Sequence, residues 1–264
     1  MKNKIKGLAA FIAVLLLSDL AVGIAQFSFA GIMWLIGKET SLAKTPLSLQ
    51  YVAITVQIVF IYLFYKNRKW DLKSELNSEN VSRGSLLITV LLGASILIMN
   101  ISIVYFIQAL GLFANSFEQA QEVTSFLNRS NYLLWFILAV ILSPVVEELL
   151  FRGAAYNVLA KYMNIKTVII LQGIVFGIFH GNLLQGILAA VIGIILGYLR
   201  FKTNSLIPAI TLHISNNLFS EVINLYTENI NNNTLVYAIL LVIGIAGVIG
   251  FIKLFNNKQN LIIA

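Results

Sequence analysis

Eight long apolar segments constrain the fold of this chain more than any other feature. A transmembrane helix needs about 20 mostly apolar residues, and segments of roughly this length recur along the chain. A soluble domain would be charged at roughly a quarter of its positions, whereas only 11% of the 264 residues are charged here. We therefore predict an all-α fold, a polytopic transmembrane helix bundle. The eight predicted spans cover about residues 8–36, 46–65, 85–113, 132–158, 165–180, 182–201, 205–226 and 234–255.

The first apolar segment follows three lysines and so begins like a secretory signal peptide. The apolar run continues to about Ile36, however, beyond any plausible cleavage site, and further spans follow it. We therefore predict that this segment is a first transmembrane helix that stays in the mature protein.

The distribution of basic residues indicates a topology. With eight spans, 15 of the 18 Lys and Arg residues fall on one side, and Lys38, Lys44 and Arg129 fall on the other. Because cytoplasmic loops are enriched in Lys and Arg, both termini are predicted to be cytoplasmic. The net charge of +7 is thus explained by topology, and no nucleic-acid partner is predicted. The Lys-, Asn- and Ile-rich composition favours a bacterial plasma membrane.

Two adjacent carboxylates and an arginine interrupt the fourth predicted span. Charges in hydrocarbon are rare and usually functional. Glu148 and Arg152 are four residues apart, with the glutamate first, so they share a helix face in the favourable order for pairing. Glu147 is turned about 100° away on a helix of 3.6 residues per turn. We therefore predict that Arg152 neutralises Glu148 and that Glu147 is the proton-transfer group.

Both histidines of the chain fall within predicted spans. His180 ends the fifth span, and His213 shares a helix face with Asn217 in the seventh. Each histidine alone is explained by an interhelical hydrogen bond. Three separate spans, however, each place a catalytic residue type in hydrocarbon, and this combination favours a catalytic site. The absence of cysteine excludes a thiol nucleophile and thiolate metal ligands.

The remaining polar residues within the spans are explained by interhelical hydrogen bonds or by a polar cavity. Among them, Asp19 is the residue that most needs a specific explanation. Glycines in the fifth and sixth spans are predicted to allow close helix packing. The loop from Ala114 to Asn131 is predicted to be external, with an amphipathic, interfacial pattern. The other polar residues are Asn100, Gln108 and Gln172, and the glycines lie at positions 173, 177, 181, 186, 193 and 197.

Three motifs occur in order along the chain. They are Glu-Glu-x-x-x-Arg at 147–152, Phe-x-x-x-His at 176–180 and His-x-x-x-Asn at 213–217. Together, on hydrophobic segments, they closely resemble the CPBP family of CAAX proteases and bacteriocin-processing enzymes. This family is also called ABI, and it includes the Ras-converting type of CAAX prenyl endopeptidase. The resemblance covers roughly residues 130–226.

The resemblance divides the chain into three parts. Residues 1–130 carry N-terminal transmembrane helices and an external loop, and no familiar motif. Residues 131–226 form the expected catalytic core. Residues 227–264 form a last span and a cytoplasmic tail.

The resemblance implies an intramembrane endopeptidase that cleaves membrane-associated peptides or proteins. Glu147 and His180 would activate a water for attack on the peptide carbonyl. His213 and Asn217 would hold the oxyanion that forms. The partners of such an enzyme are its membrane-associated substrate and the lipid bilayer.

The same resemblance makes Glu148 and Arg152 supporting residues and raises the question of a metal. Family members are often labelled metalloproteases, and Glu147, His180 and His213 would leave a zinc ion one open position for water. No His-Glu-x-x-His motif is present, and these ligands come from three separate spans. We therefore favour a water activated by Glu and His without a metal, with zinc as the alternative.

Two other functions compete with a peptidase. A non-catalytic relative would act in bacteriocin immunity or membrane regulation, but the motif residues are all intact. A transporter would often have repeated halves or matching broken helices, and the sequence has neither. The substrate stays open between a prenylated protein, the eukaryotic role, and a bacterial peptide precursor, signal peptide or self-immunity role.

Overall fold

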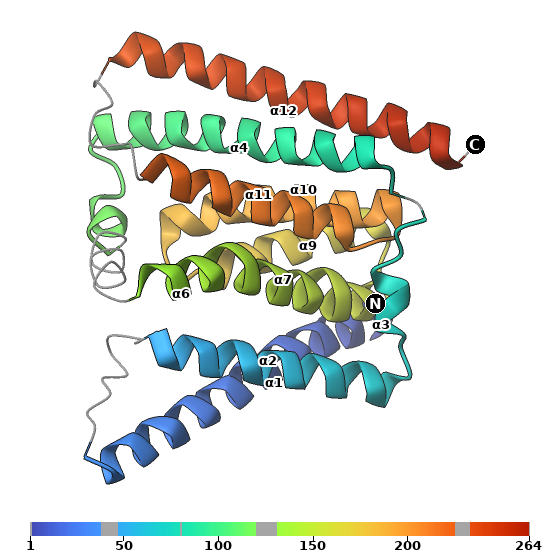
Figure 1. Cartoon of the computed structure of the whole chain (residues 1–264). Coiled ribbons are helices and arrows are strands. Elements are labelled where there is room, and N and C mark those ends of the chain that lie inside the picture. The colour runs from blue at the N-terminus through green and yellow to red at the C-terminus, as the bar shows by residue number, and fades with distance from the viewer. Residues whose placement is uncertain (1, 38–46, 80, 120–130, 225–232, 264) are drawn as a thin grey trace. The chain divides into compact units, whose positions relative to one another are not determined.

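The fold is helical throughout the described part of the chain, as predicted (Figure 1). The computed structural model describes residues 2–37, 47–79, 81–119, 131–224 and 233–263. All eight predicted apolar segments appear as helices, which confirms the all-α, polytopic bundle. Part of the predicted external loop, at 120–130, lies outside the described residues.

Six helical stretches in the described residues are long and apolar enough to cross a membrane. The other two predicted spans are α9 (Ile165–Ile178), with 14 residues, and α11 (Ile207–Asn224), with 18. α9 is short because the chain turns after it, where Gly181 adopts a left-handed φ of 69°. α11 is less apolar because it carries the polar run 215–217.

The chain folds into two compact units that are interleaved in sequence. The first comprises 1–72 and 121–168, and the second comprises 73–120 and 169–264. α9 begins in the first unit and continues into the second.

In the first unit, α1 (Lys2–Leu35) and α2 (Leu47–Arg68) contact each other and the helical stretch at 132–160. The interior of the unit is mostly apolar, with Phe11 and Leu15 of α1 fully buried. The stretch at 132–160 consists of five consecutive pieces, which are α6 (Tyr132–Phe136), η2 (Ile137–Leu142), α7 (Ser143–Glu148), η3 (Leu149–Ala155) and α8 (Tyr156–Ala160).

The pieces η2 and η3 are π-helical, and they flank α7 on both sides. Pro144 lies in the first turn of α7. Because proline has no backbone N–H and its ring crowds the preceding turn, it accounts for the irregular hydrogen bonding before α7. Single π turns inside α-helices occur frequently at functional sites.

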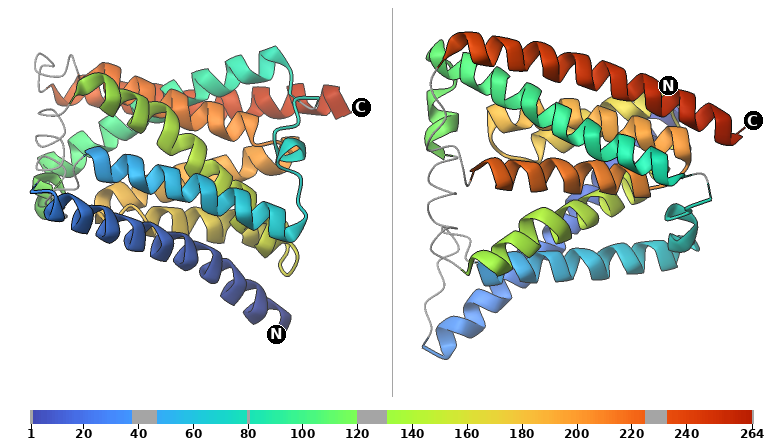
Figure 2. Two further views of the ribbon diagram at one scale, coloured as in Figure 1. Left: turned by 60° about the horizontal axis from the view of Figure 1, so that its bottom comes forward. Right: turned by 45° about the horizontal axis from the view of Figure 1, so that its top comes forward.

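The second unit contains a short helix, α3 (Leu72–Glu75), and four long helices. These are α4 (Arg83–Ala109), α10 (Leu183–Thr203), α11 and α12 (Thr234–Ile263). α4 runs beside α12 and also contacts α11 (Figure 2). Eight buried apolar side chains from the four long helices form one core cluster, Leu92, Ile96, Ile192, Leu196, Leu199, Ala209, Leu212 and Phe255. This cluster fixes the position of α11, since Leu212 immediately precedes His213.

Glycines bring α9 and α10 into close contact, as the sequence predicted. A Cβ atom added at Gly173 would lie 2.7 Å from the backbone nitrogen of Ile194. Cβ atoms added at Gly177 and Gly186 would each collide with the other glycine's carbonyl oxygen. The backbones therefore approach more closely than any larger residue would allow.

Candidate active site

The predicted ion pair between Glu148 and Arg152 is present in the first unit. Arg152 Nη1 donates to Glu148 Oε1 at 2.9 Å, and both side chains are completely buried. Isolated buried charges are very costly, and a hydrogen-bonded partner offsets much of that cost. The contact confirms the pairing inferred from the spacing of four residues.

Glu147 differs from its neighbour in exposure. Its side chain is half-buried, whereas that of Glu148 is fully buried. The rotation of about 100° per residue explains why adjacent carboxylates face different surroundings. Part of the Glu147 side chain is thus accessible, as the predicted role in proton transfer requires.

The two histidines of the second unit contact the same aromatic ring. Phe176, in α9, is buried, and its ring centroid lies 4.7 Å from that of His180 and 5.7 Å from that of His213. Both contacts are edge-to-face, the favourable geometry for aromatic pairs. The ring of Phe176 therefore contacts both His180, which follows α9, and His213, which lies in α11.

The backbone selects the tautomer of His180. Its Nδ1 lies 2.9 Å from the carbonyl oxygen of Phe176. Because a carbonyl oxygen only accepts hydrogen bonds, Nδ1 carries a proton, and in the neutral ring Nε2 then carries the lone pair. The ring is half-buried, so Nε2 is the atom of His180 that can accept a proton or orient a water.

His213 and Asn217 occupy one face of α11, one helical turn apart. His213 is 6% exposed and Asn217 is half-buried. α4 approaches α11 closely beside them, because a Cβ atom added at Gly93 would lie 3.0 Å from Cβ of Ser215. This packing restricts how far α11 can move or rotate.

Asn182 holds the turn that carries His180, a role that the sequence analysis missed. Its Oδ1 accepts from the backbone N–H of Gln185 and so caps α10, at 3.1 Å. Its Nδ2 donates to the Ser116 carbonyl oxygen at 2.9 Å and to Gln119 Oε1 at 3.0 Å. The Asn-x-x-Gln sequence before an apolar run is a helix-start signal that could have revealed the cap.

The predicted site residues are divided between the two units. Glu147, Glu148 and Arg152 belong to the first, and His180, His213 and Asn217 belong to the second. The first unit thus holds the ion pair of Glu148 and Arg152 beside the half-buried carboxylate of Glu147. The second unit holds His180 and His213 against the ring of Phe176, with Asn217 one turn after His213.

A catalytic zinc ion would need three protein ligands close together. Within the described ranges, no three His, Asp or Glu side chains are gathered so as to hold a metal. The second unit offers two imidazoles, fewer than the three protein ligands of a typical catalytic zinc site. Glu147, the third candidate ligand, belongs to the first unit, and no catalytic step is assigned to a metal.

Long apolar helices carrying buried ionisable groups define a multi-pass membrane protein. Residues 129–219 match a family model described as type II CAAX prenyl endopeptidase Rce1-like. The match confirms the resemblance to the CAAX protease family, and it supports a peptidase. The region contains all three motifs. No curated protein and no solved structure matched the chain.

Replacing Phe176 by leucine is expected to disturb both histidines at once. Each aromatic pair contributes roughly 0.5–1.5 kcal/mol beyond its buried area, so losing two should cost about 1–3 kcal/mol of unfolding free energy. Because the chain has only two histidines, ¹⁵N-histidine NMR reports on each ring separately. Both sets of imidazole signals should shift in Phe176→Leu.

The matched control is Phe60→Leu, since Phe60 stacks on Phe64 in α2. This change should leave the imidazole signals in place. Unchanged signals in Phe176→Leu would contradict the shared-ring arrangement, and an Nε2–H tautomer for His180 would contradict its assigned role.

Proposed function

We propose that the protein is an intramembrane endopeptidase that hydrolyses membrane-associated peptides or proteins with a water activated by Glu147 and His180. The observation that carries this proposal is the family match over residues 129–219, which includes every motif residue. The half-buried Glu147 and the acceptor Nε2 of His180 support it, because both roles need an accessible basic atom.

The proposed reaction begins with removal of a proton from water. Glu147 takes the proton while His180 Nε2 orients the water, and the oxygen adds to the peptide carbonyl carbon. His213 and Asn217 donate hydrogen bonds to the oxyanion that forms on the carbonyl oxygen. Collapse of this intermediate breaks the C–N bond, and the proton held by Glu147 passes to the leaving amine.

The ion pair of Glu148 and Arg152 is proposed to support this chemistry indirectly. It keeps one carboxylate neutralised within the helix that carries Glu147. Without a local counter-charge, a fully buried carboxylate would be costly inside this helical stretch. The pair is therefore a supporting element, in contact with neither water nor substrate in this mechanism.

A proteomic comparison of native membranes tests the function. Membranes containing wild-type protein and membranes containing Glu147→Gln should differ in the termini of a small set of membrane-associated peptides or proteins. Uncleaved precursors should accumulate in the variant. If terminal peptides are identical, the protein acts by binding, as a relative in immunity or regulation would.

Asn217→Ala and His213→Ala separate the metal-free mechanism from a zinc mechanism. If both side chains stabilise the oxyanion, each change should lower turnover about 10²–10³-fold with little effect on substrate binding. Elemental analysis of the purified variants provides the second measurement. Stoichiometric zinc that is lost in both His180→Ala and His213→Ala would contradict the metal-free mechanism.

We propose a bacterial plasma membrane location with eight spans and both termini in the cytoplasm. The 15-to-3 distribution of basic residues supports this topology. Tags after residue 1 and residue 264 should be protected from membrane-impermeant reagents in intact cells, whereas a tag within 114–131 should react. Labelling of either terminus from outside would contradict the topology.

A further inference from the structure

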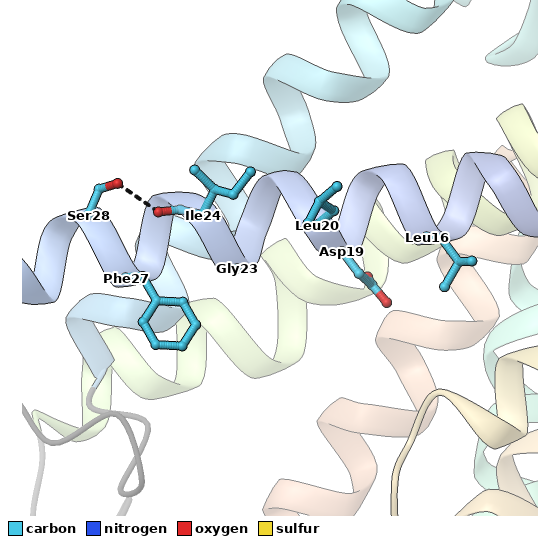
Figure 3. Close-up of a pocket in the computed structure, with 7 residues that line it drawn as sticks. All are labelled: Leu16, Asp19, Leu20, Gly23, Ile24, Phe27 and Ser28. Carbon is cyan, nitrogen blue, oxygen red and sulfur yellow. Dashed lines mark hydrogen bonds between the residues drawn. The ribbon is translucent and has the colours of Figure 1, made fainter.

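Two of the acidic residues outside the motifs have very different surroundings. Asp19 projects into a groove that is lined by residues of α1 (Figure 3). Glu75 ends the short helix α3 of the second unit, and it is only 8% exposed. Charged side chains are almost never buried unless they are paired, so the contacts of Glu75 need an explanation.

The side chain of Glu75 forms a buried ion pair with Arg200, in the last turn of α10. Arg200 Nη2 donates to Glu75 Oε2, although 125 residues separate the two. The other arm of the guanidinium, Nη1, donates to Asn204 Oδ1 at 2.9 Å. Because the planar guanidinium fixes the angle between its donors, it holds the carboxylate and the amide in one arrangement at the end of α10.

The backbone of Glu75 holds the residue that precedes α11. Its carbonyl oxygen accepts a hydrogen bond from the N–H of Leu206 at 2.7 Å. The carbonyl oxygen of Leu206 in turn accepts from the N–H of Ile210 at 2.9 Å, as in a regular helix. Glu75 is therefore bonded to the start of α11 through its backbone and to the end of α10 through its side chain.

The turn between α10 and α11 has few degrees of freedom. Asn204 ends α10 in a left-handed conformation, with a φ of 49°. The N–H of Ser205 donates to Thr203 Oγ1 at 3.3 Å, and the N–H of Ile207 donates to Ser205 Oγ at 3.2 Å. Thr203, Ser205 and Leu206 are each 1% exposed or less. A turn this short and this well bonded joins α11 firmly to the ion pair.

Leu206 lies on the same helix face as the two motif residues of α11. His213 and Asn217 follow it by 7 and 11 residues, which is about two and three turns at 3.6 residues per turn. A rotation at the start of α11 is therefore passed on to both side chains. The apolar core and the contact at Gly93 hold the middle of α11, whereas Glu75 anchors its start.

We propose that Glu75 and Arg200 are positioning residues that set the rotation of α11 and so aim His213 and Asn217. The proposal rests on the proposed function, in which these two side chains hold the oxyanion. Such donors act only when they lie within hydrogen-bond distance of the oxyanion. Replacing a buried ion pair by apolar side chains of similar volume is often neutral for stability, so stability alone does not account for this pair.

The double variant Glu75→Leu with Arg200→Met separates positioning from stability. It removes both charges and keeps similar volumes, so it should unfold in detergent at the same midpoint as wild type. The ¹⁵N-histidine spectrum should nevertheless change, with the two rings assigned from His180→Gln. The signals of His213 should shift, whereas those of His180, which is bonded to the backbone of α9, should stay in place.

Turnover of a precursor provides the second readout. A misaimed oxyanion donor weakens transition-state binding more than substrate binding, so kcat should fall about 10–10²-fold in the double variant, with little change in KM. Glu75→Gln keeps an oxygen that accepts from Arg200, although the hydrogen bond loses the charge on its acceptor. It should shift the His213 signals less and retain more turnover than the double variant.

The matched control is Tyr198→Phe, two residues before Arg200 in α10. The hydroxyl of Tyr198 donates to Asn256 Oδ1 in α12, so this substitution removes an interhelical hydrogen bond of α10 that does not involve α3 or α11. The His213 signals and kcat should match those of wild type. Circular dichroism of each variant confirms that the compared proteins are folded.

Unchanged His213 signals in the folded double variant would overturn the proposal, as would equal shifts of both histidines, which indicate general loosening. Full turnover of a precursor that wild type cleaves would also overturn it, and would leave the ion pair a structural role alone. The spectra require no peptidase activity. A failure of the proposed function and a failure of this positioning role are therefore told apart.

Discussion

Glu147→Gln is expected to lower peptide cleavage about 10²–10⁴-fold, the usual contribution of a general base. The amide has nearly the same shape as the carboxylate but cannot take a proton from water. Because Glu147 is half-buried and Glu148 makes the ion pair, the substitution should leave the fold intact. Turnover of a precursor identified in the proteomic comparison, together with circular dichroism, measures both effects.

A matched control for this substitution is Glu79→Gln, which changes an exposed glutamate that precedes α4. Its activity should equal that of wild type. Full activity in Glu147→Gln would remove Glu147 from the reaction and contradict the proposed mechanism, while the family match would be unaffected.

Arg152→Ala is expected to destabilise the protein by roughly 3–5 kcal/mol, because it leaves the fully buried Glu148 carboxylate without its ion-pair partner. Folding yield and the midpoint of detergent-induced unfolding should both fall. The double variant Glu148→Gln with Arg152→Met removes both charges and keeps similar volumes. It should therefore recover part of the lost stability.

The control for Arg152 is Arg83→Ala, which removes an exposed arginine at the start of α4. Exposed substitutions usually change stability by less than about 0.5 kcal/mol. If Arg152→Ala is as abundant and as stable as Arg83→Ala, the ion pair of Glu148 and Arg152 does not stabilise the folded protein as predicted.

Much of the helical framework could be predicted because membrane thickness fixes how long an apolar helix must be. All eight apolar segments became helices for this reason. The bounds of α9 and α11 also lie within two residues of the predicted spans at each end. The π-helical pieces η2 and η3 were not predicted, because side-chain polarity does not report which carbonyl each backbone N–H selects.

The candidate site was predictable where its geometry is local. Glu148 and Arg152 lie four residues apart on one helix, so spacing alone indicated their contact. The meeting of His180 and His213 on Phe176 depends on how α9 and α11 pack, and no spacing in the sequence encodes that. The hydrogen bonds of Asn182 to Ser116 and Gln119 are equally remote, since more than 60 residues separate the partners.

The π-helical piece η3 makes the orientation of the glutamate pair tolerant of a change in chain length. A π turn accommodates one residue more than an α-helical turn does. Deleting one residue within 149–155 would let this piece relax to a regular α-helix while the part before it keeps nearly the same orientation relative to α8. Deleting one residue from the regular helix α8 would instead rotate the part before it by about 100°, so that Glu147 would point in a new direction. In both cases the helix would still be long and apolar enough for a membrane, so only the second deletion would separate the ability to insert from the ability to act.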